Sequence, residues 1–278
     1  NPSVNKKSTD WMDELLRSGF MQNYTVSYSS GSDKAHYYIS GGLLDQSGIV
    51  RSVSYRRYTF QANSDAQVLK WIKFTDNIAI SADEHKEGTY DIGSTMKALP
   101  GFAVKEDNGN WTGPEGNSDW YGSVRNPIGT TELNKNKTNG YNLLTNLTSE
   151  ITFVKWLKFR STLGLDAKFW YYDNYTPKYN WKPTPVEESS RYKGDNKSFT
   201  YLWDNYFIFD YTFAQKHHVG IMAGTSAQWN DYDYLNAQKN IFAFENVHEM
   251  DNGQKMYAIG GNETEWSLLS YMARANYD

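Results

Sequence analysis

Apolar and polar residues alternate along much of this chain, most clearly between Phe199 and Phe213. The odd-numbered positions there are almost all aromatic: Phe199, Tyr201, Trp203, Asn205, Phe207, Phe209, Tyr211 and Phe213. The even-numbered positions are mixed, with charges at Asp204 and Asp210. Because successive side chains of a strand point to opposite faces, this stretch is predicted to be a strand with one aromatic face and one charged face.

Leu157 to Tyr171 repeats the pattern. Its apolar set includes Leu163, Leu165 and Phe169, and its polar set includes Lys158, Arg160, Asp166 and Lys168. About nine segments of this kind are present, several longer than the five or six residues common in soluble sheets. They lie near residues 20–30, 35–44, 55–66, 71–82, 140–153, 157–172, 198–213, 217–229 and 265–278.

Short and long connections between these segments alternate. The short ones are 31–34, 67–70, 154–156 and 214–216. The long ones are polar, turn-rich and lie near 45–54, 83–139, 173–197 and 230–264. Outer-membrane barrels have short turns on the periplasmic side and long loops outside. The sequence therefore predicts an all-β, antiparallel up-and-down transmembrane β-barrel segment of about nine strands, joined as one continuous meander.

Two local features are expected outside the strands. Residues 1–19 form a helix and loop lead-in, in which Thr9 to Leu16 is predicted to be a short helix capped by Thr9 or Asp10. Asp107-Asn108-Gly109-Asn110 predicts a tight turn inside the longest loop.

The composition narrows the possible functions. Phe, Trp and Tyr make up 16% of the 278 residues, although the mean hydropathy is -0.74. Aromatic rings in such a polar chain suit a membrane interface or a sugar-binding face. The net charge of -4 argues against a nucleic-acid partner. The lack of cysteine excludes disulfides and thiolate metal sites, and no apolar run reaches the roughly 18 residues of a transmembrane helix.

Several motifs, in order along the chain, resemble SusC/RagA-type TonB-dependent transporters. They include Thr9-Asp10-Trp11, Gln22-Asn23-Tyr24, Gly31-Ser32-Asp33-Lys34, Tyr37-Tyr38-Ile39-Ser40, Leu44-Asp45-Gln46-Ser47-Gly48-Ile49-Val50, Tyr55-Arg56-Arg57-Tyr58 and Leu69-Lys70-Trp71-Ile72-Lys73-Phe74. Trp156-Leu157-Lys158-Phe159-Arg160 and Arg274-Ala275-Asn276-Tyr277 are similar too. The run from Thr9 to Phe74 is the most specific, and the long loops match little. Gln61 departs from the pattern, since the family usually has Arg there.

The resemblance implies import of an oligomeric nutrient, a glycan or an oligopeptide, across the Gram-negative outer membrane. It implies a SusD-like lipoprotein lid, energy from the TonB complex, and contact with the lipid bilayer. It also implies a plugged barrel of about 22 strands. Nine strands cannot close such a barrel, and both ends of the sequence look cut. We therefore expect residues 1–278 to be part of a TonB-dependent receptor β-barrel domain, with the plug and TonB box elsewhere.

No catalytic motif stands out, so we expect neither an enzyme nor a cofactor. His217 and His218 are adjacent on a strand and would point to opposite faces, which argues against a shared metal. The acids of the last long loop could hold Ca²⁺, but their spacing matches no EF-hand. These acids are Asp231, Asp233, Glu245, Glu249 and Asp251. We expect no metal site.

Aromatic residues in the long loops are the candidate ligand contacts, because flat rings can stack on sugars or bury peptide side chains. The candidates are Trp120, Tyr121, Trp181, Tyr232 and Tyr234. The charged face is expected to point into the lumen, because exposing a charge to lipid is costly. Its residues are Lys158, Arg160, Asp166, Asp204 and Asp210. The alternatives are a secreted β-sandwich that binds or hydrolyses glycans, which explains the aromatic content but not the alternating loop lengths, and a passive porin-like barrel.

Overall fold

The computed structural model describes residues 8–113, 124–179, 185–244, 246–247 and 249–278. These residues form one antiparallel sheet of nine strands in the order of the sequence, β1 to β9. The strands are β1 (Met21–Ser32), β2 (Ala35–Ser47), β3 (Ser54–Leu69), β4 (Ile72–Lys86), β5 (Lys135–Val154), β6 (Leu157–Thr176), β7 (Ser190–Phe213), β8 (His217–Phe242) and β9 (Gly253–Tyr277). Every strand pairs with its sequence neighbours, so the predicted meander is confirmed.

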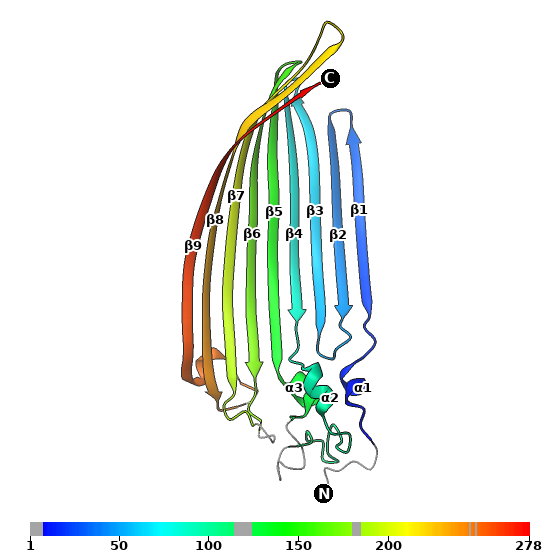
Figure 1. Ribbon diagram of the computed structural model, residues 1–278, viewed down its shortest axis with the longest axis vertical. Helices are drawn as coiled ribbons and strands as arrows, with labels where there is room; N and C mark the ends of the chain where they lie inside the picture. The colour runs from blue at the N-terminus through cyan, green and yellow to red at the C-terminus, as the bar shows by residue number, and fades with distance from the viewer. Residues whose placement is uncertain (1–7, 114–123, 180–184, 245, 248) are drawn as a thin grey trace.

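The connections divide between the two ends of the sheet (Figure 1). Tight turns at 33–34, 70–71, 155–156 and 214–216 lie at one end. The connections 48–53, 87–134, 177–189 and 243–252 lie at the other, which we name the loop end. The loops are shorter than expected, because β5 to β9 reach 20 to 26 residues.

Among the described residues, three short helices lie at the loop end: α1 (Trp11–Leu15), α2 (Ile92–Lys97) and α3 (Pro127–Leu133). A 3-10 turn, η2 (Met250–Asn252), precedes β9. The helix expected near Thr9 is present, and the Asp10 side chain accepts hydrogen bonds from the amides of Met12 and Asp13. The turn expected at Asp107 to Asn110 is also present, with Gly109 at a φ of 85°. No helix within the described ranges is long and apolar enough to cross a membrane.

A small apolar core forms where these helices meet. It consists of Trp11, Leu15, Val50, Phe102 and Ile128. Side chains on the sheet itself are far more exposed, and large apolar ones are among them. The fold therefore places its compact packing at the loop end and leaves the broad sheet open to its surroundings.

Candidate ligand-binding wall on the sheet

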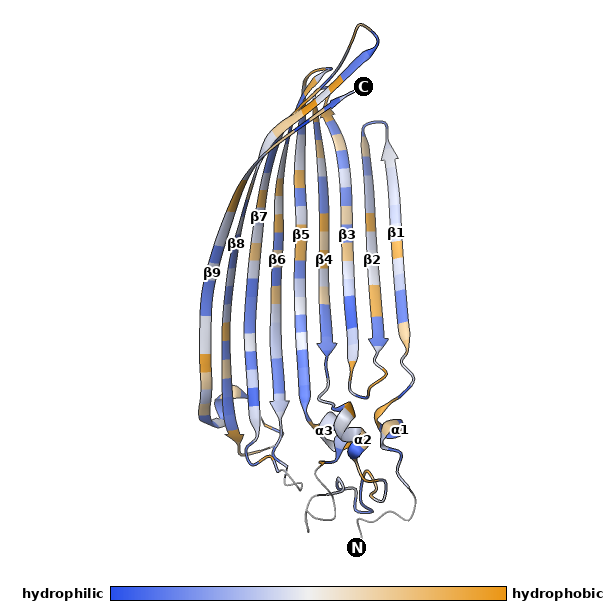
Figure 2. Cartoon of the chain, in the orientation of Figure 1, coloured by the Kyte–Doolittle hydropathy of each residue, from blue (hydrophilic) through white to orange (hydrophobic). Residues whose placement is uncertain are grey.

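The register of the strands gathers the apolar residues on one face. Leu163 on β6 pairs with Leu147 on β5 and with Trp203 on β7, so these side chains share a face. The same face carries Val26 and Ile39 at the other edge of the sheet. Figure 2 shows the resulting alternation of polar and apolar positions along the strands. We name this side the apolar face and the opposite side the polar face. The expected aromatic and aliphatic set shares the apolar face: Phe199, Tyr201, Trp203, Phe207, Phe209, Leu163, Leu165 and Phe169.

Aromatic contacts border the apolar face at two levels. Near the tight turns, the ring of Trp156 lies edge-on to Phe209, with centroids 5.5 Å apart. Toward the loop end, Tyr201 stacks on Trp229 at 5.2 Å. From Tyr201 to Tyr211, ten steps of about 3.3 Å give roughly 33 Å along β7. A strand tilt of 35–45° would reduce this height to about 23–27 Å, close to the apolar band of outer-membrane barrels, ~25 Å tall.

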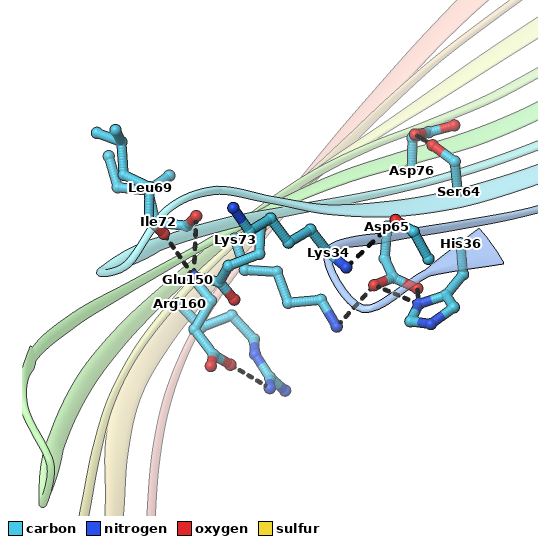
Figure 3. Close-up of polar contacts among 12 residues, drawn as sticks. Lys34, His36, Ser64, Asp65, Leu69, Ile72, Lys73, Asp76, Glu150 and Arg160 are labelled. Atoms are coloured by element: carbon cyan, nitrogen blue, oxygen red, sulfur yellow. Dashed lines mark hydrogen bonds and ion pairs between the residues drawn. The ribbon is translucent and has the colours of Figure 1, made fainter.

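The half of the polar face near the tight turns carries paired charges (Figure 3). The Asp65 carboxylate lies 3.3 Å from Nδ1 of His36 and 3.1 Å from Nζ of Lys73. Glu150, on β5, forms a second network with cations of β6. The side chains involved are 16 to 62% exposed, so water screens these pairs and each adds little to stability.

All five residues expected to face the lumen share the polar face: Lys158, Arg160, Asp166, Asp204 and Asp210. Lys158 and Arg160 both bind Glu150, at 3.0 and 2.7 Å. Asp166 pairs with Lys168 at 2.8 Å. Beside this last pair the polar face is hollowed over a volume of about 590 Å³. Polar-face side chains around the hollow include Arg57, Thr59, Ser81, Asp83, Asn142, Asp166 and Lys168.

Toward the loop end the polar face changes character and becomes aromatic. Trp170 on β6 and Tyr232 on β8 lean across β7, and their rings are nearly parallel, with centroids 5.8 Å apart and an interplanar angle of 13°. Tyr234 follows at 5.9 Å from Tyr232. The register adds further rings to the same face. We name this set the aromatic wall: Trp170, Tyr172, Tyr192, Tyr232, Tyr234 and Trp266.

Side-chain amides lie among the rings of the aromatic wall. The hydroxyl of Tyr232 donates to Oδ1 of Asn196 at 3.0 Å. Nδ2 of Asn230 donates to Ser198, at 3.0 Å, and to Thr200, at 2.9 Å. These bonds hold the polar groups in one arrangement before any ligand arrives. The wall can therefore offer flat apolar surfaces together with oriented hydrogen-bonding groups.

At the same level, the apolar face carries charged residues. There the strands carry charges, such as Lys197 paired with Asp233 at 2.8 Å. Asp231, Glu263 and Glu265 lie together on this face, with carboxylate oxygens within 4.8 Å of one another. Exposed carboxylates alone do not indicate a cation, so we assign them no metal. Beyond the stack of Tyr201 and Trp229, this face mixes these charges with the rings of Phe169 and Phe199.

No family model matches the chain, but individual proteins do. The TonB-dependent receptor P3 of Formosa agariphila is 24% identical over 98% of this chain. The TonB-dependent receptor SusC of Bacteroides thetaiotaomicron is 22% identical over 97% of it. The chain spans 28% of the length of each of these two relatives. One chain in a solved structure of the RagAB peptide importer superposes on this chain with a TM-score of 0.84 at 19% sequence identity. The match covers 100% of this chain and 32% of the importer chain.

The resemblance to SusC/RagA-type TonB-dependent receptors is confirmed. The nine strands correspond to part of a TonB-dependent receptor barrel. The named relatives are receptors and importers rather than enzymes, as the lack of catalytic motifs led us to expect.

Within this receptor-like barrel section, the candidate ligand residues fall into two groups. Trp120, Tyr121 and Trp181 lie outside the described residues. Tyr232 and Tyr234 belong to β8 and not to a loop, because β8 continues to Phe242. The loop expected at 230–264 therefore shrinks to residues 243–252. Asp231 and Asp233 lie within β8, paired with Glu265 and Glu263 of β9.

The sequence analysis missed four members of the aromatic wall: Trp170, Tyr172, Tyr192 and Trp266. Trp170 and Tyr172 stand at even positions, which are the polar positions of β6. Ligand contacts are expected in loops, whereas these four rings lie on the polar face of strands. The signal was available in the alternation itself, since Trp170, Tyr172 and Asn174 continue the even-numbered set beyond Lys168.

The helices of the loop end are held by buried polar contacts. Asn126 caps α3 by accepting from the amide of Gly129 at 3.0 Å. Its Nδ2 donates to the carbonyl oxygens of Val104, at 2.8 Å, and Thr112, at 3.3 Å. At α2, hydrogen bonds from the side chain and amide of Ser94 hold the pKa of the Asp91 carboxyl below its ordinary value. These bonds lie within the connection between β4 and β5, which is joined to the start of the chain by the indole N–H of Trp11, donating to the Leu99 carbonyl at 2.9 Å, and by the apolar core.

Proposed function

We propose that these nine strands form one section of the outer-membrane barrel of a TonB-dependent importer of an oligomeric nutrient, a glycan or an oligopeptide. The observation that carries the proposal is the apolar face. It bears large exposed side chains on every strand, including Val26 (78% exposed), Leu163 (55%) and Tyr271 (78%). A continuous exposed surface of this kind is stable against lipid and unfavourable in water.

The polar face then lines the lumen. Lys158, Arg160, Asp166, Asp204 and Asp210 would meet water or a plug domain there, where charges keep their solvation or gain partners. The tight turns would lie in the periplasm and the loop end outside the cell. A SusD-like lipoprotein would close over the loop end, and the TonB complex would act on the plug. The relatives named as TonB-dependent receptors support this arrangement.

A secreted β-sandwich is a poorer explanation. Two packed sheets would bury the apolar face, whereas the described residues form a single sheet with that face exposed. A passive porin-like barrel would share the apolar face, so only dependence on energy separates it from an importer.

The test is nutrient uptake by cells that carry the complete transporter, with and without a functional TonB. We expect uptake to stop when TonB is deleted, and to fall sharply when the connection 177–189 is shortened. Insertion of the barrel, followed by surface labelling, should be normal in the shortened variant. Uptake that continues at the same rate without TonB would exclude energised import and indicate a passive pore.

A further inference from the structure

We infer that the aromatic wall is a binding site for an uncharged oligosaccharide. The inference rests on the proposed function, because it requires the polar face to line a lumen that solutes can enter. It goes further by choosing between the two substrate classes that the proposed function leaves open. Its basis is the combination of rings, amides and missing charges at one level of five adjacent strands.

The rings offer the apolar surface that a sugar needs. The C–H groups on one side of a pyranose ring pack well against a flat aromatic face, and Trp and Tyr add a polar edge. Trp170 and Tyr232 lie nearly parallel, within 13° of each other, and Tyr234 is tilted by 31° to Tyr232. Trp266 pairs with Asn230 on the same face and is 48% exposed. The rings therefore extend across several strands, as successive sugar units would require.

Glycine keeps this surface flat. Gly194 on β7 pairs with Tyr172 on β6, and a Cβ at Gly194 would lie 3.3 Å from the Tyr172 ring and 3.2 Å from the Tyr192 hydroxyl. Without that Cβ, the two tyrosines can lie close over the backbone. Hydrogen-bonding groups for sugar hydroxyls are interleaved with the rings, at Asn196 and Asn230.

The charge distribution favours an uncharged ligand. At the level of the wall, the polar face of β5 to β9 carries no charged side chain. The segments concerned are 136–142 of β5, 170–174 of β6, 192–198 of β7, 230–236 of β8 and 260–266 of β9. The same segments carry many charges on the opposite face, so the absence is specific to one side. Asp83 on β4 borders these segments beside Gly140, and below the wall Asp166 and Lys168 neutralise each other at 2.8 Å.

This neutrality discriminates among ligand classes. A sulfated or uronic-acid glycan would need lysine or arginine, because bound anions are held by paired charges. A peptide of mixed sequence brings charged termini and side chains that a neutral wall leaves without partners. An uncharged oligosaccharide needs only rings, amides and hydroxyls, and the wall provides all three.

The experiment uses the purified complete transporter in detergent and measures binding by calorimetry. The probes are uncharged oligosaccharides of glucose, mannose, galactose and xylose, sulfated and uronic-acid oligosaccharides, and a tryptic peptide mixture. The variants are Trp170→Leu and Tyr232→Leu. The matched control is Trp229→Leu, which removes an equally stacked ring from the opposite face of the same strand.

We expect at least one uncharged oligosaccharide to bind, and affinity to fall about tenfold in each wall variant, since loss of one stacked ring removes on the order of 1 kcal/mol. Trp229→Leu should leave the affinity unchanged. Binding of only peptides or only anionic glycans, or of no probe, would overturn the inference, as would binding that the wall variants do not weaken. Because this assay involves no TonB, it can fail while energy-dependent uptake of another nutrient upholds the proposed function.

Discussion

Substitution of arginine for leucine on the two faces of the sheet, at one level, tests which face meets lipid. Leu163 on β6 lies midway in sequence between Trp156, in the turn before that strand, and Tyr171, and it shares the apolar face with Trp203. Leu202 on β7 pairs with Gly164 and lies on the polar face, beside Asp204. The two leucines are therefore neighbours in level and opposite in direction. Leu163→Arg and Leu202→Arg make the same chemical change in two different surroundings.

We expect Leu163→Arg to destabilise the barrel by about 2–4 kcal/mol, the cost of an arginine near the middle of the bilayer. Leu202→Arg should cost less than about 1 kcal/mol, because its guanidinium reaches water and the Asp204 carboxylate. The complete protein would be folded into phospholipid vesicles, and its folded fraction followed by band shift through a guanidinium titration. An equal cost at both positions, or a larger cost at Leu202, would refute the assignment of the apolar face to lipid.

Three further predictions concern the loop end and the strands. Asn126→Ala should destabilise the loop-end helices by about 1–3 kcal/mol, because it removes the cap of α3 and one donor from each of the carbonyls of Val104 and Thr112; limited proteolysis of the loop end measures this. Gly224→Ala should destabilise the barrel by about 1–3 kcal/mol in the same titration, because its Cβ would overlap a backbone carbonyl, whereas Gly220→Ala, with no heavy atom closer than 3.9 Å, should be nearly neutral. The lowered pKa of Asp91 means that its cap stabilises α2 above the ordinary carboxyl pKa and that this contribution is lost as pH falls through the lowered value. Hydrogen-exchange protection of the Ser94 amide should therefore fall in acid, and Asp91→Asn should remove that pH dependence.

Much of the sheet can be predicted from the sequence, because period-two alternation follows directly from strand geometry. From Phe199 to Phe213 every odd position except Asn205 is aromatic, which identifies both the strand and the residues that share its apolar face. Pairing of β1 with β2, β3 with β4, β5 with β6 and β7 with β8 then follows from the tight turns, since two or three residues can connect only adjacent antiparallel strands. The strand ends were harder to predict, since β8 continues well beyond Trp229.

The candidate site was only partly predictable for the same reason. Tyr232 and Tyr234 were selected as ligand contacts, but as loop residues. Trp170 is 62 positions from Tyr232 in the sequence, and the two rings meet only through the register of β6, β7 and β8. Nothing local in the sequence shows that two rings on different strands will lean together. That information enters only when the strands are paired.

Near the loop end, charged residues occur on the face that is apolar elsewhere, and aromatic rings occur on the face that is charged elsewhere. This change explains both why the strand ends were missed and where the aromatic wall lies. Between the aromatic borders, one face is apolar and the other charged, as expected for strands between lipid and a wet lumen. Above the stack of Tyr201 and Trp229, charges such as Asp231 and Glu263 occupy the formerly apolar face. On the proposed function, a hydrophobic pattern that ends there indicates the end of the lipid layer and not the end of the strand. The strands would then continue for several residues into water, and their inner side would be free to carry aromatic rings. Rings at that level would be the first part of the barrel wall that an arriving nutrient meets, before the charged half deeper in the lumen. Selection by stacking at the mouth and contact with a plug through paired charges below would therefore be carried by different levels of the same nine strands.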